Sequence, residues 1–172
     1  MKEARWFRDR AARRLIVLGY LPWLAGLSLA WEIAHVSLYT LWQEAGLPYI
    51  AFSIAHCTAG DVLIGGAALL LVLILGREGE LARWRWSRIA ALTSLLGVSY
   101  TLFSEWMNIT ILRSWSYADA MPTLALGAIE IGVSPLAQWL IVPALALYLA
   151  LAAARRGRDP SARISSGTAP GR

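Results

Sequence analysis

The chain has little of what a water-soluble protein needs at its surface. Charged residues make up 16% of its 172 residues, against about 25% in typical soluble domains. There is one cysteine, Cys57, so neither an intrachain disulfide nor a cysteine-based metal cage can form. The sequence also lacks a phosphate-binding glycine loop and an internal repeat. Too few polar side chains are present to face water on all sides.

What the sequence has instead is hydrophobic residues, which make up 58% of the chain. A helix needs about 20 mostly apolar residues to cross a bilayer. Four stretches qualify, at about residues 15–39, 49–76, 89–112 and 133–154. In lipid they must be helices, because a helix satisfies its backbone hydrogen bonds within one segment. The sequence therefore predicts an all-α, polytopic membrane four-helix bundle in one domain, residues 1–154, followed by a disordered basic tail, residues 155–172.

The positive charges predict the orientation of this bundle. Of the 16 Lys and Arg residues, 15 lie in the N-terminal arm, in the loop between the second and third spans, or in the tail. Arg113 alone lies on the other side. The positive-inside rule assigns the richer side to the cytoplasm. We therefore expect a multi-pass protein of the bacterial inner (plasma) membrane with both termini cytoplasmic (N-in/C-in), with the lipid bilayer and not nucleic acid as its partner.

The first span has a competing interpretation. A basic start, an apolar run and Ser28-Leu29-Ala30 are typical of a secretory signal peptide with its cleavage site. The apolar run continues past this site to Leu38, however. We therefore expect the segment to remain as a transmembrane helix.

Ionisable and polar residues within the spans are the candidate functional site, because a charge at mid-bilayer costs about 2.5–3.5 kcal/mol on insertion scales. These residues are Glu32, His35, His56, Asp61, Glu105, Asn108 and Gln138. A rise of about 1.5 Å per residue places all of them in the periplasmic half of the bilayer. Helical spacing gives two inward-facing stripes. The first is Ser28, Glu32, His35 and Tyr39, and the second is Ser94, Gly97, Thr101, Glu105 and Asn108.

Two further features bear on this site. His56 and Asp61 are five residues apart, so they diverge by about 140° around one helix and face different neighbours. The connection Arg113–Gly132 is long for a helical bundle and carries Trp115 and Tyr117. It is expected to cover the site as a lid, or to be an interfacial segment anchored by its aromatics.

These residues predict several roles. Glu105 and His56 would act as acid, base or ligand, and a second set would contact a ligand: Glu32, His35, Asp61, Asn108, Trp115, Tyr117 and Gln138. Candidate metal ligands are His35, His56, Glu32 and Glu105, because Glu32-x-x-His35 has the spacing used in carboxylate-bridged metal bundles. That motif occurs once, and the depths of the two histidines differ by about two turns, which disfavours haem. The cofactor and any reaction stay open, and a purely structural hydrogen-bond network is the alternative.

Local strings of the sequence also suggest a family. They are HCTAGD at residues 56–61, SEWMN at 104–108, SWSY at 114–117, Met121-Pro122, and Ser134-Pro135-Leu136 followed by Gln138-Trp139. Together they resemble a group of small uncharacterised bacterial four-helix integral membrane proteins, usually labelled hypothetical. The likeness covers most of residues 15–150 and implies the topology but no activity.

The functional hypothesis is a small inner-membrane protein with a buried polar site in its periplasmic half that binds a small ligand or a metal. The alternative is a structural or assembly subunit with a membrane-protein partner, or a homo-oligomer. A transporter ranks third, because four helices leave little room for alternating access.

Overall fold

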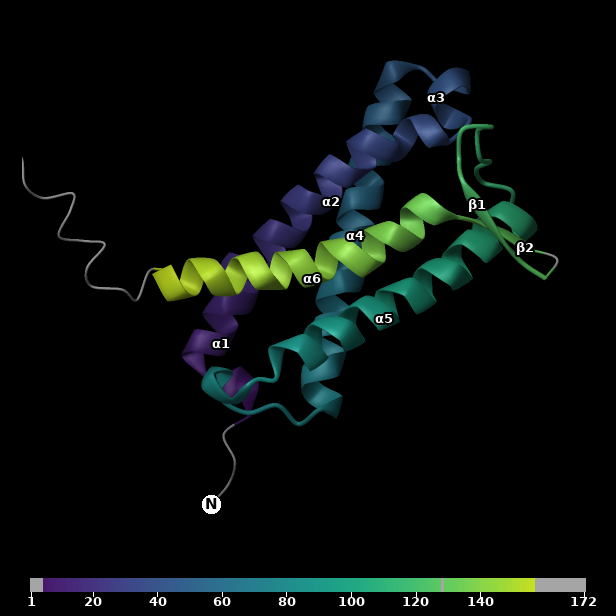
Figure 1. The fold of residues 1–172 in the computed structure, drawn as a ribbon. Helices are drawn as coiled ribbons and strands as arrows, with labels where there is room; N and C mark the ends of the chain where they lie inside the picture. Colours follow the sequence, from purple (N-terminus) through teal and green to yellow (C-terminus); the bar gives the residue numbers. More distant parts are fainter. Residues whose placement is uncertain (1–4, 128, 157–172) are drawn as a thin grey trace, which may run out of the picture.

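A computed structural model describes residues 5–127 and 129–156, and this part of the chain is mostly helical (Figure 1). The predicted tail lies outside the described residues from 157 onwards. The first long helix comprises α1 (Arg10–Leu15), a π-helical turn (Ile16–Tyr20), α2 (Leu21–His35) and a 3-10 turn (Val36–Leu38). Next come α3 (Leu41–Glu44), α4 (Leu47–Leu75), α5 (Trp86–Glu105) and a π-helical turn (Trp106–Ile111). The strands β1 (Thr123–Leu126) and β2 (Ile129–Gly132) precede α6 (Val133–Arg156), and short 3-10 turns lie at Trp6–Arg8 and Leu81–Arg83.

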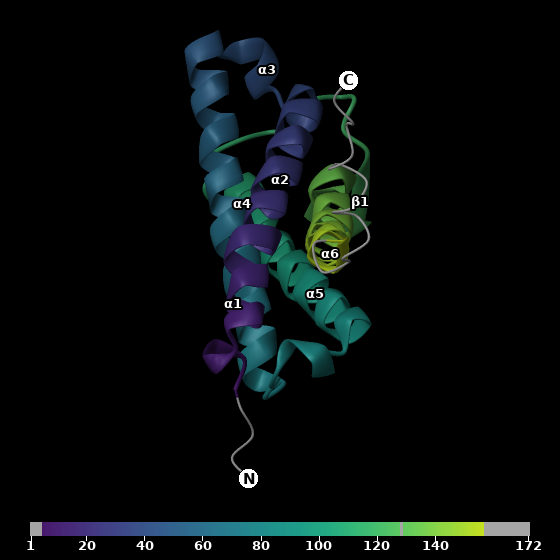
Figure 2. The same cartoon turned by 90° about the vertical axis from the view of Figure 1, so that its left-hand side faces the viewer.

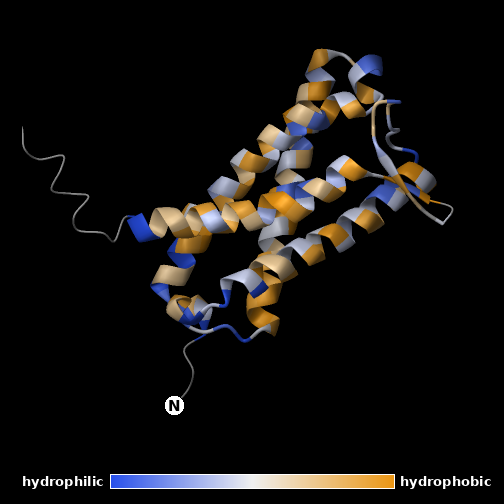
Figure 3. Ribbon diagram, in the orientation of Figure 1, coloured by the Kyte–Doolittle hydropathy of each residue, from blue (hydrophilic) through white to orange (hydrophobic). Residues whose placement is uncertain are grey.

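Three of these helices are long and apolar enough to cross a membrane, which identifies a candidate multi-pass membrane protein. They are Arg10–Leu38, Leu47–Leu75 and Val133–Arg156. Their bounds agree with three predicted spans to within about five residues. The remaining predicted span, residues 89–112, corresponds to α5 and its π-turn. This segment contains more polar residues and packs between α4 and α6. Hydrophobic residues run along the helices, as Figure 3 shows.

Each π-turn interrupts a long helix. Pro22 has no backbone N–H and cannot donate a hydrogen bond to the carbonyl four residues before it. The helix therefore widens into the π-turn that begins before Pro22 and leads into α2. The second π-turn begins directly after Glu105. It rotates the following residues relative to a regular helix. The predicted stripe on α5 is buried through Glu105, whereas Asn108 is only half-buried.

The prediction of an all-helical chain is wrong for the segment before α6. β1 and β2 pair as an antiparallel hairpin with Thr123 opposite Gly132 and Leu126 opposite Ile129. Gly127 has φ +66°, a left-handed conformation suited to the tight turn. The connection before it is tied to the end of the first helix, because the Thr40 N–H donates to the Ser116 carbonyl over 3.0 Å.

The apolar core lies at the opposite end of the bundle from the hairpin. Its fully buried members include Tyr20 and Leu24 on the first helix and Leu69 and Leu73 on α4. The Tyr20 hydroxyl donates to the Gly65 carbonyl over 3.1 Å. A Cβ on Gly65 would lie 2.7 Å from Leu24 Cδ2, so this glycine permits the close approach of α2 and α4.

Three basic segments gather at this same end. The Trp6 N–H donates to the Glu78 carbonyl over 3.2 Å, and the Leu81 N–H donates to Asp9 Oδ2 over 2.8 Å. These bonds tie the N-terminal arm to the loop between α4 and α5. The C-terminal part of α6 packs against the π-turn of the first helix, where Gly19 meets Ala150. Figure 2 shows the start of the first helix and the connection from α4 to α5 at one end of the molecule.

Gly97 provides a test of the packing between α5 and α6. A Cβ at Gly97 would overlap the ring of Trp139. Gly97→Ala should therefore lower the free energy of unfolding by about 1–3 kcal/mol through overpacking. The measurement is the thermal unfolding midpoint of the purified protein in detergent micelles. Gly26→Ala is the matched control, because a Cβ there meets nothing within 4 Å, and its midpoint should not fall.

Candidate functional site

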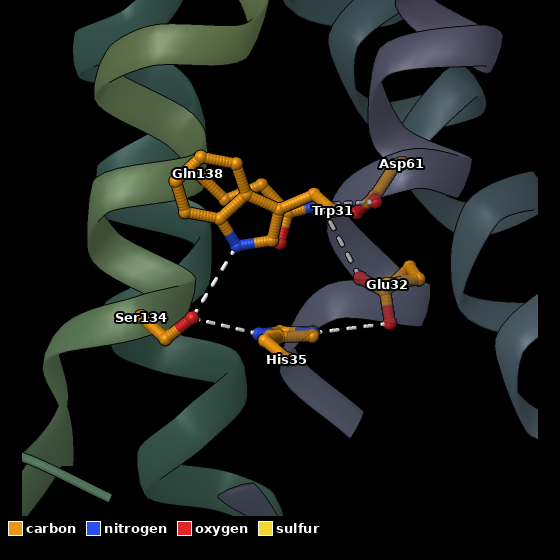
Figure 4. A network of polar contacts seen from close by, with 6 residues as sticks. All are labelled: Trp31, Glu32, His35, Asp61, Ser134 and Gln138. Atoms are coloured by element: carbon orange, nitrogen blue, oxygen red, sulfur yellow. Dashed lines mark hydrogen bonds and ion pairs between the residues drawn. The ribbon is translucent and has the colours of Figure 1, made fainter. Parts of the chain in front are cut away.

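One side-chain amide links three helices at the hairpin end. Gln138 Nε2, on α6, donates to Glu32 Oε1 on α2 over 3.2 Å and to Asp61 Oδ2 on α4 over 2.6 Å (Figure 4). A primary amide has two N–H donors, and here each donor meets a carboxylate. The acceptors on both sides fix which amide atom is the nitrogen. Gln138 therefore places two acidic groups from different helices beside one another.

A second chain of hydrogen bonds orients His35. The Trp31 indole N–H donates to Ser134 Oγ over 3.3 Å, and Ser134 Oγ lies 2.9 Å from His35 Nδ1. His35 Nε2 lies 3.2 Å from Glu32 Oε2. Donors and acceptors balance when Ser134 donates to Nδ1 and Nε2–H donates to the Glu32 carboxylate. In this arrangement both nitrogens of the imidazole are engaged.

Glu105 belongs to a separate link, between α5 and the hairpin. The Tyr117 hydroxyl donates to Glu105 Oε2 and accepts from the Gly132 N–H over 2.8 Å. Burial, followed by the hydrogen bond to Glu105, raises the pKa of Tyr117, so the phenol stays protonated as a donor. The Trp115 indole N–H faces the same carboxylate, and it is buried without a hydrogen bond of normal geometry.

Both groups of residues border one cavity of about 550 Å³. This volume is within the usual range of small-ligand sites. Its polar lining includes Glu32, His35, Asp61, Thr101, Glu105 and Gln138. Phe52 and Ile64 on α4 and Tyr100 on α5 contribute apolar surface. None of the lining residues, all of them within the described chain, is Lys or Arg.

The structure brings together most of the residues singled out in the sequence. Every predicted site residue except Tyr117 lines the cavity, and the Tyr117 hydroxyl donates a hydrogen bond to the Glu105 carboxylate. His56 is exposed at the rim and stacks on Phe52 at 5.7 Å between ring centroids. Asp61 instead bonds Gln138 on α6, although both residues line the same cavity. Asn108 donates to the Ser104 carbonyl of its own helix over 2.9 Å. The acid–base role of Glu105 and His56 stays a prediction.

The described residues give little support to a metal site. Within residues 5–127 and 129–156, no group of three or more His, Cys, Asp or Glu side chains is placed to hold a metal ion. Ser134 and Glu32 engage both nitrogens of His35.

Sequence reasoning missed Trp31, Ser134 and the apolar rim of the cavity. Trp31 was not among the predicted site residues, and Ser134 stood only in the string Ser134-Pro135-Leu136 at the start of α6. An indole N–H needs a partner when it is buried, which was the available signal for Trp31. No local signal pairs it with a residue 103 positions away.

No family model, curated protein or solved structure matches the chain. The site is therefore interpreted from its own geometry.

Tyr117→Phe tests the link between Glu105 and the hairpin. Loss of the hydroxyl leaves the buried Gly132 N–H and the Glu105 carboxylate without this partner. A typical hydrogen bond contributes about 0.5–1.5 kcal/mol, so amide hydrogen exchange at Gly132 should be up to about tenfold faster. Hydrogen-exchange mass spectrometry of peptides from residues 123–132 provides the measurement. Tyr148→Phe, on the exposed face of α6, should leave that rate unchanged, and an unchanged rate in Tyr117→Phe would contradict the link.

Proposed function

We propose that the protein is a four-span inner-membrane protein with both termini in the cytoplasm and that it binds a small ligand in the periplasmic half of its bundle. The observation that carries this proposal is the cavity of about 550 Å³ with a polar floor. The charge asymmetry of the loops supports the orientation. In this orientation the hairpin and α3 are periplasmic, and the apolar core occupies the cytoplasmic half.

The energetics of the polar cluster support a binding role. Buried ion pairs and polar networks can often be replaced by apolar residues of similar volume without loss of stability. The cytoplasmic half of this bundle is packed in that way, around Leu24, Leu69 and Leu73. The periplasmic half instead keeps three carboxylates at an open cavity: Glu32, Asp61 and Glu105. Intramembrane ionisable groups of this kind mark functional sites by default.

The residues divide into two roles under this proposal. Glu105 and Asp61 present carboxylate oxygens to the ligand, while Tyr117 positions Glu105 and Gln138 positions Asp61. His35 positions Glu32, which shares the Gln138 amide with Asp61. The hairpin, tied to Glu105 through Tyr117, covers the site from the periplasm. His56 at the rim contacts the ligand at the entrance.

The alternative is a structural subunit of a larger membrane complex. The observation that favours it is the hydrogen-bond network of α2, α4 and α6, which would also serve simply to fix helix packing. Co-purification of stoichiometric partner proteins would support this alternative.

The topology follows from the 15-to-1 distribution of positive charges. Alkaline phosphatase is active only in the periplasm, so fusions after Gln43 or Asp119 should be active, and fusions after Arg83 or Arg158 should be silent. Enzyme assays on cells that express each fusion at a similar level provide the measurement. Activity at Arg83 would reverse the orientation.

Glu105→Gln separates a ligand site from a structural network. The amide keeps the shape of the side chain and can still accept from Tyr117, but it removes the ionisable group. The variant should insert normally, with a thermal midpoint close to that of the wild type, yet fail to complement a strain that lacks the gene. Glu44 is at the end of the short helix α3 and does not line the cavity, so Glu44→Gln should complement fully. Full complementation by a Glu32→Gln, Glu105→Gln double variant would favour the structural subunit.

A further inference from the structure

The mouth of the cavity lies between α4 and α5. Five lining residues on these two helices are also exposed, namely Tyr49, Phe52, His56, Cys57 and Tyr100, and so is Ser114 in the connection after α5. Phe52 is 62% exposed and Tyr100 47% exposed. The two helices diverge towards the hairpin end in Figure 1. The cavity is thus bordered by α2 and α6 on one side and is open between α4 and α5 on the other.

This mouth lies at the depth of the hydrocarbon. At about 1.5 Å per residue, Phe52 is about 8 Å from the start of α4 at Leu47, and Asp61 is about 21 Å from it. Both residues belong to a candidate membrane span, Leu47–Leu75. A bilayer core is about 30 Å thick. The opening between α4 and α5 therefore faces lipid chains, and a ligand can enter sideways.

The floor of the cavity is rich in hydrogen-bond acceptors. Glu105 and Glu32 are buried, and Asp61 lies with them in the lining. Thr101 adds a hydroxyl to this lining: the residue is 5% exposed and borders the cavity, and no hydrogen bond to another described residue engages its hydroxyl. A ligand group at this position can therefore bond to the Thr101 hydroxyl without displacing a protein partner.

The charges of the lining select the head group. Three carboxylates border the cavity and no Lys or Arg does. Because opposite charges attract and like charges repel strongly at low dielectric constant, a phosphate or carboxylate head group would be rejected. A hydroxyl or an ammonium group supplies the donors that the carboxylates and Thr101 can accept.

We infer that the cavity takes an amphiphile from the bilayer, with a head group that donates hydrogen bonds and carries no negative charge. Its apolar chain passes between α4 and α5 along Phe52 and Tyr100, and its head group lies at Thr101 and Glu105. The inference rests on the proposed ligand-binding function, to which it adds the chemical class of the ligand and its route.

The test uses three photoreactive probes of equal chain length: hexadecanol, hexadecylamine and hexadecanoic acid, each with a diazirine in the chain. The full-length protein is reconstituted in phosphatidylcholine vesicles and irradiated, and labelled residues are mapped by mass spectrometry. The alcohol or the amine should label α4 and α5 at the cavity rim about tenfold more than the acid does, the equivalent of about 1.4 kcal/mol. A preference for the amine identifies a cationic head group, and a preference for the alcohol a neutral one. Equal labelling of the rim by the acid would overturn the inference.

Two glycines provide a matched pair of variants for the same assay. Gly60 lines the cavity and a Cβ there meets nothing within 4 Å, so Gly60→Phe projects into the open space. Gly26 also has open space, but it lies outside the cavity lining. Rim labelling should fall about tenfold in Gly60→Phe and should not change in Gly26→Phe. Unchanged labelling in Gly60→Phe contradicts the inference. Should that variant not insert, Thr101→Val, which removes the free hydroxyl, should lower labelling by the alcohol about threefold, and no decrease overturns the inference.

Complementation by Gly60→Phe distinguishes this inference from the proposed function. Loss of complementation together with unselective labelling means that the cavity is functional but holds another class of ligand, so the amphiphile inference alone fails. Full complementation by a well-inserted Gly60→Phe means that the cavity is not needed, and the proposed function then fails too.

Discussion

The Gln138 amide, shared between carboxylates on α2 and α4, is the interaction on which the hairpin end of the bundle depends. Glu32 and Asp61 would repel one another strongly in a medium of low dielectric constant if they were ionised without a donor between them. The two amide hydrogens of Gln138 meet one carboxylate each. The next residue, Trp139, lies about 100° around α6 and fills the space above Gly97 on α5. Two adjacent side chains thus dock α6 against all three of the other long helices.

The two ends of the bundle solve the packing problem differently. At the end with the N-terminal arm, buried Leu and Ala side chains close the interior, and the Tyr20 hydroxyl is satisfied by a carbonyl on α4. At the hairpin end the interior is held by directional hydrogen bonds, which fix distances between helices without filling the space around them. Interhelical hydrogen bonds in membrane proteins contribute only about 0.6 kcal/mol each on average. Stability alone does not account for so many polar groups beside an unfilled cavity.

The sequence predicted the long helices because the thickness of a bilayer sets the length of an apolar run. It also predicted the stripe of Ser28, Glu32 and His35, because a regular helix has a fixed periodicity. Asn108 departs from its stripe because a π-turn follows Glu105, and the sequence carries no clear signal for that widening. The hairpin was missed although Gly127 and the β-branched residues around it favour strands, because the long connection was interpreted only as a lid or an interfacial segment. The bonds between Trp31, Ser134 and His35 depend on how α2 meets α6, which no local pattern specifies.

Glu105 is positioned both by its own helix and by the connection that precedes α6. It ends the regular part of α5, the π-turn begins at the next residue, and its carboxylate is held by a phenol that also binds the backbone of β2. The position of this acidic group is therefore set from outside the apolar span, by the connection before α6, whereas Glu32 and Asp61 are set by helix packing within the span. A change in the charge or contacts of Glu105 would reach the hairpin through a single hydroxyl group. The same change would reach α2 and α4 only across the cavity itself. The hairpin is thus tied to Glu105 more directly than α2 or α4 is.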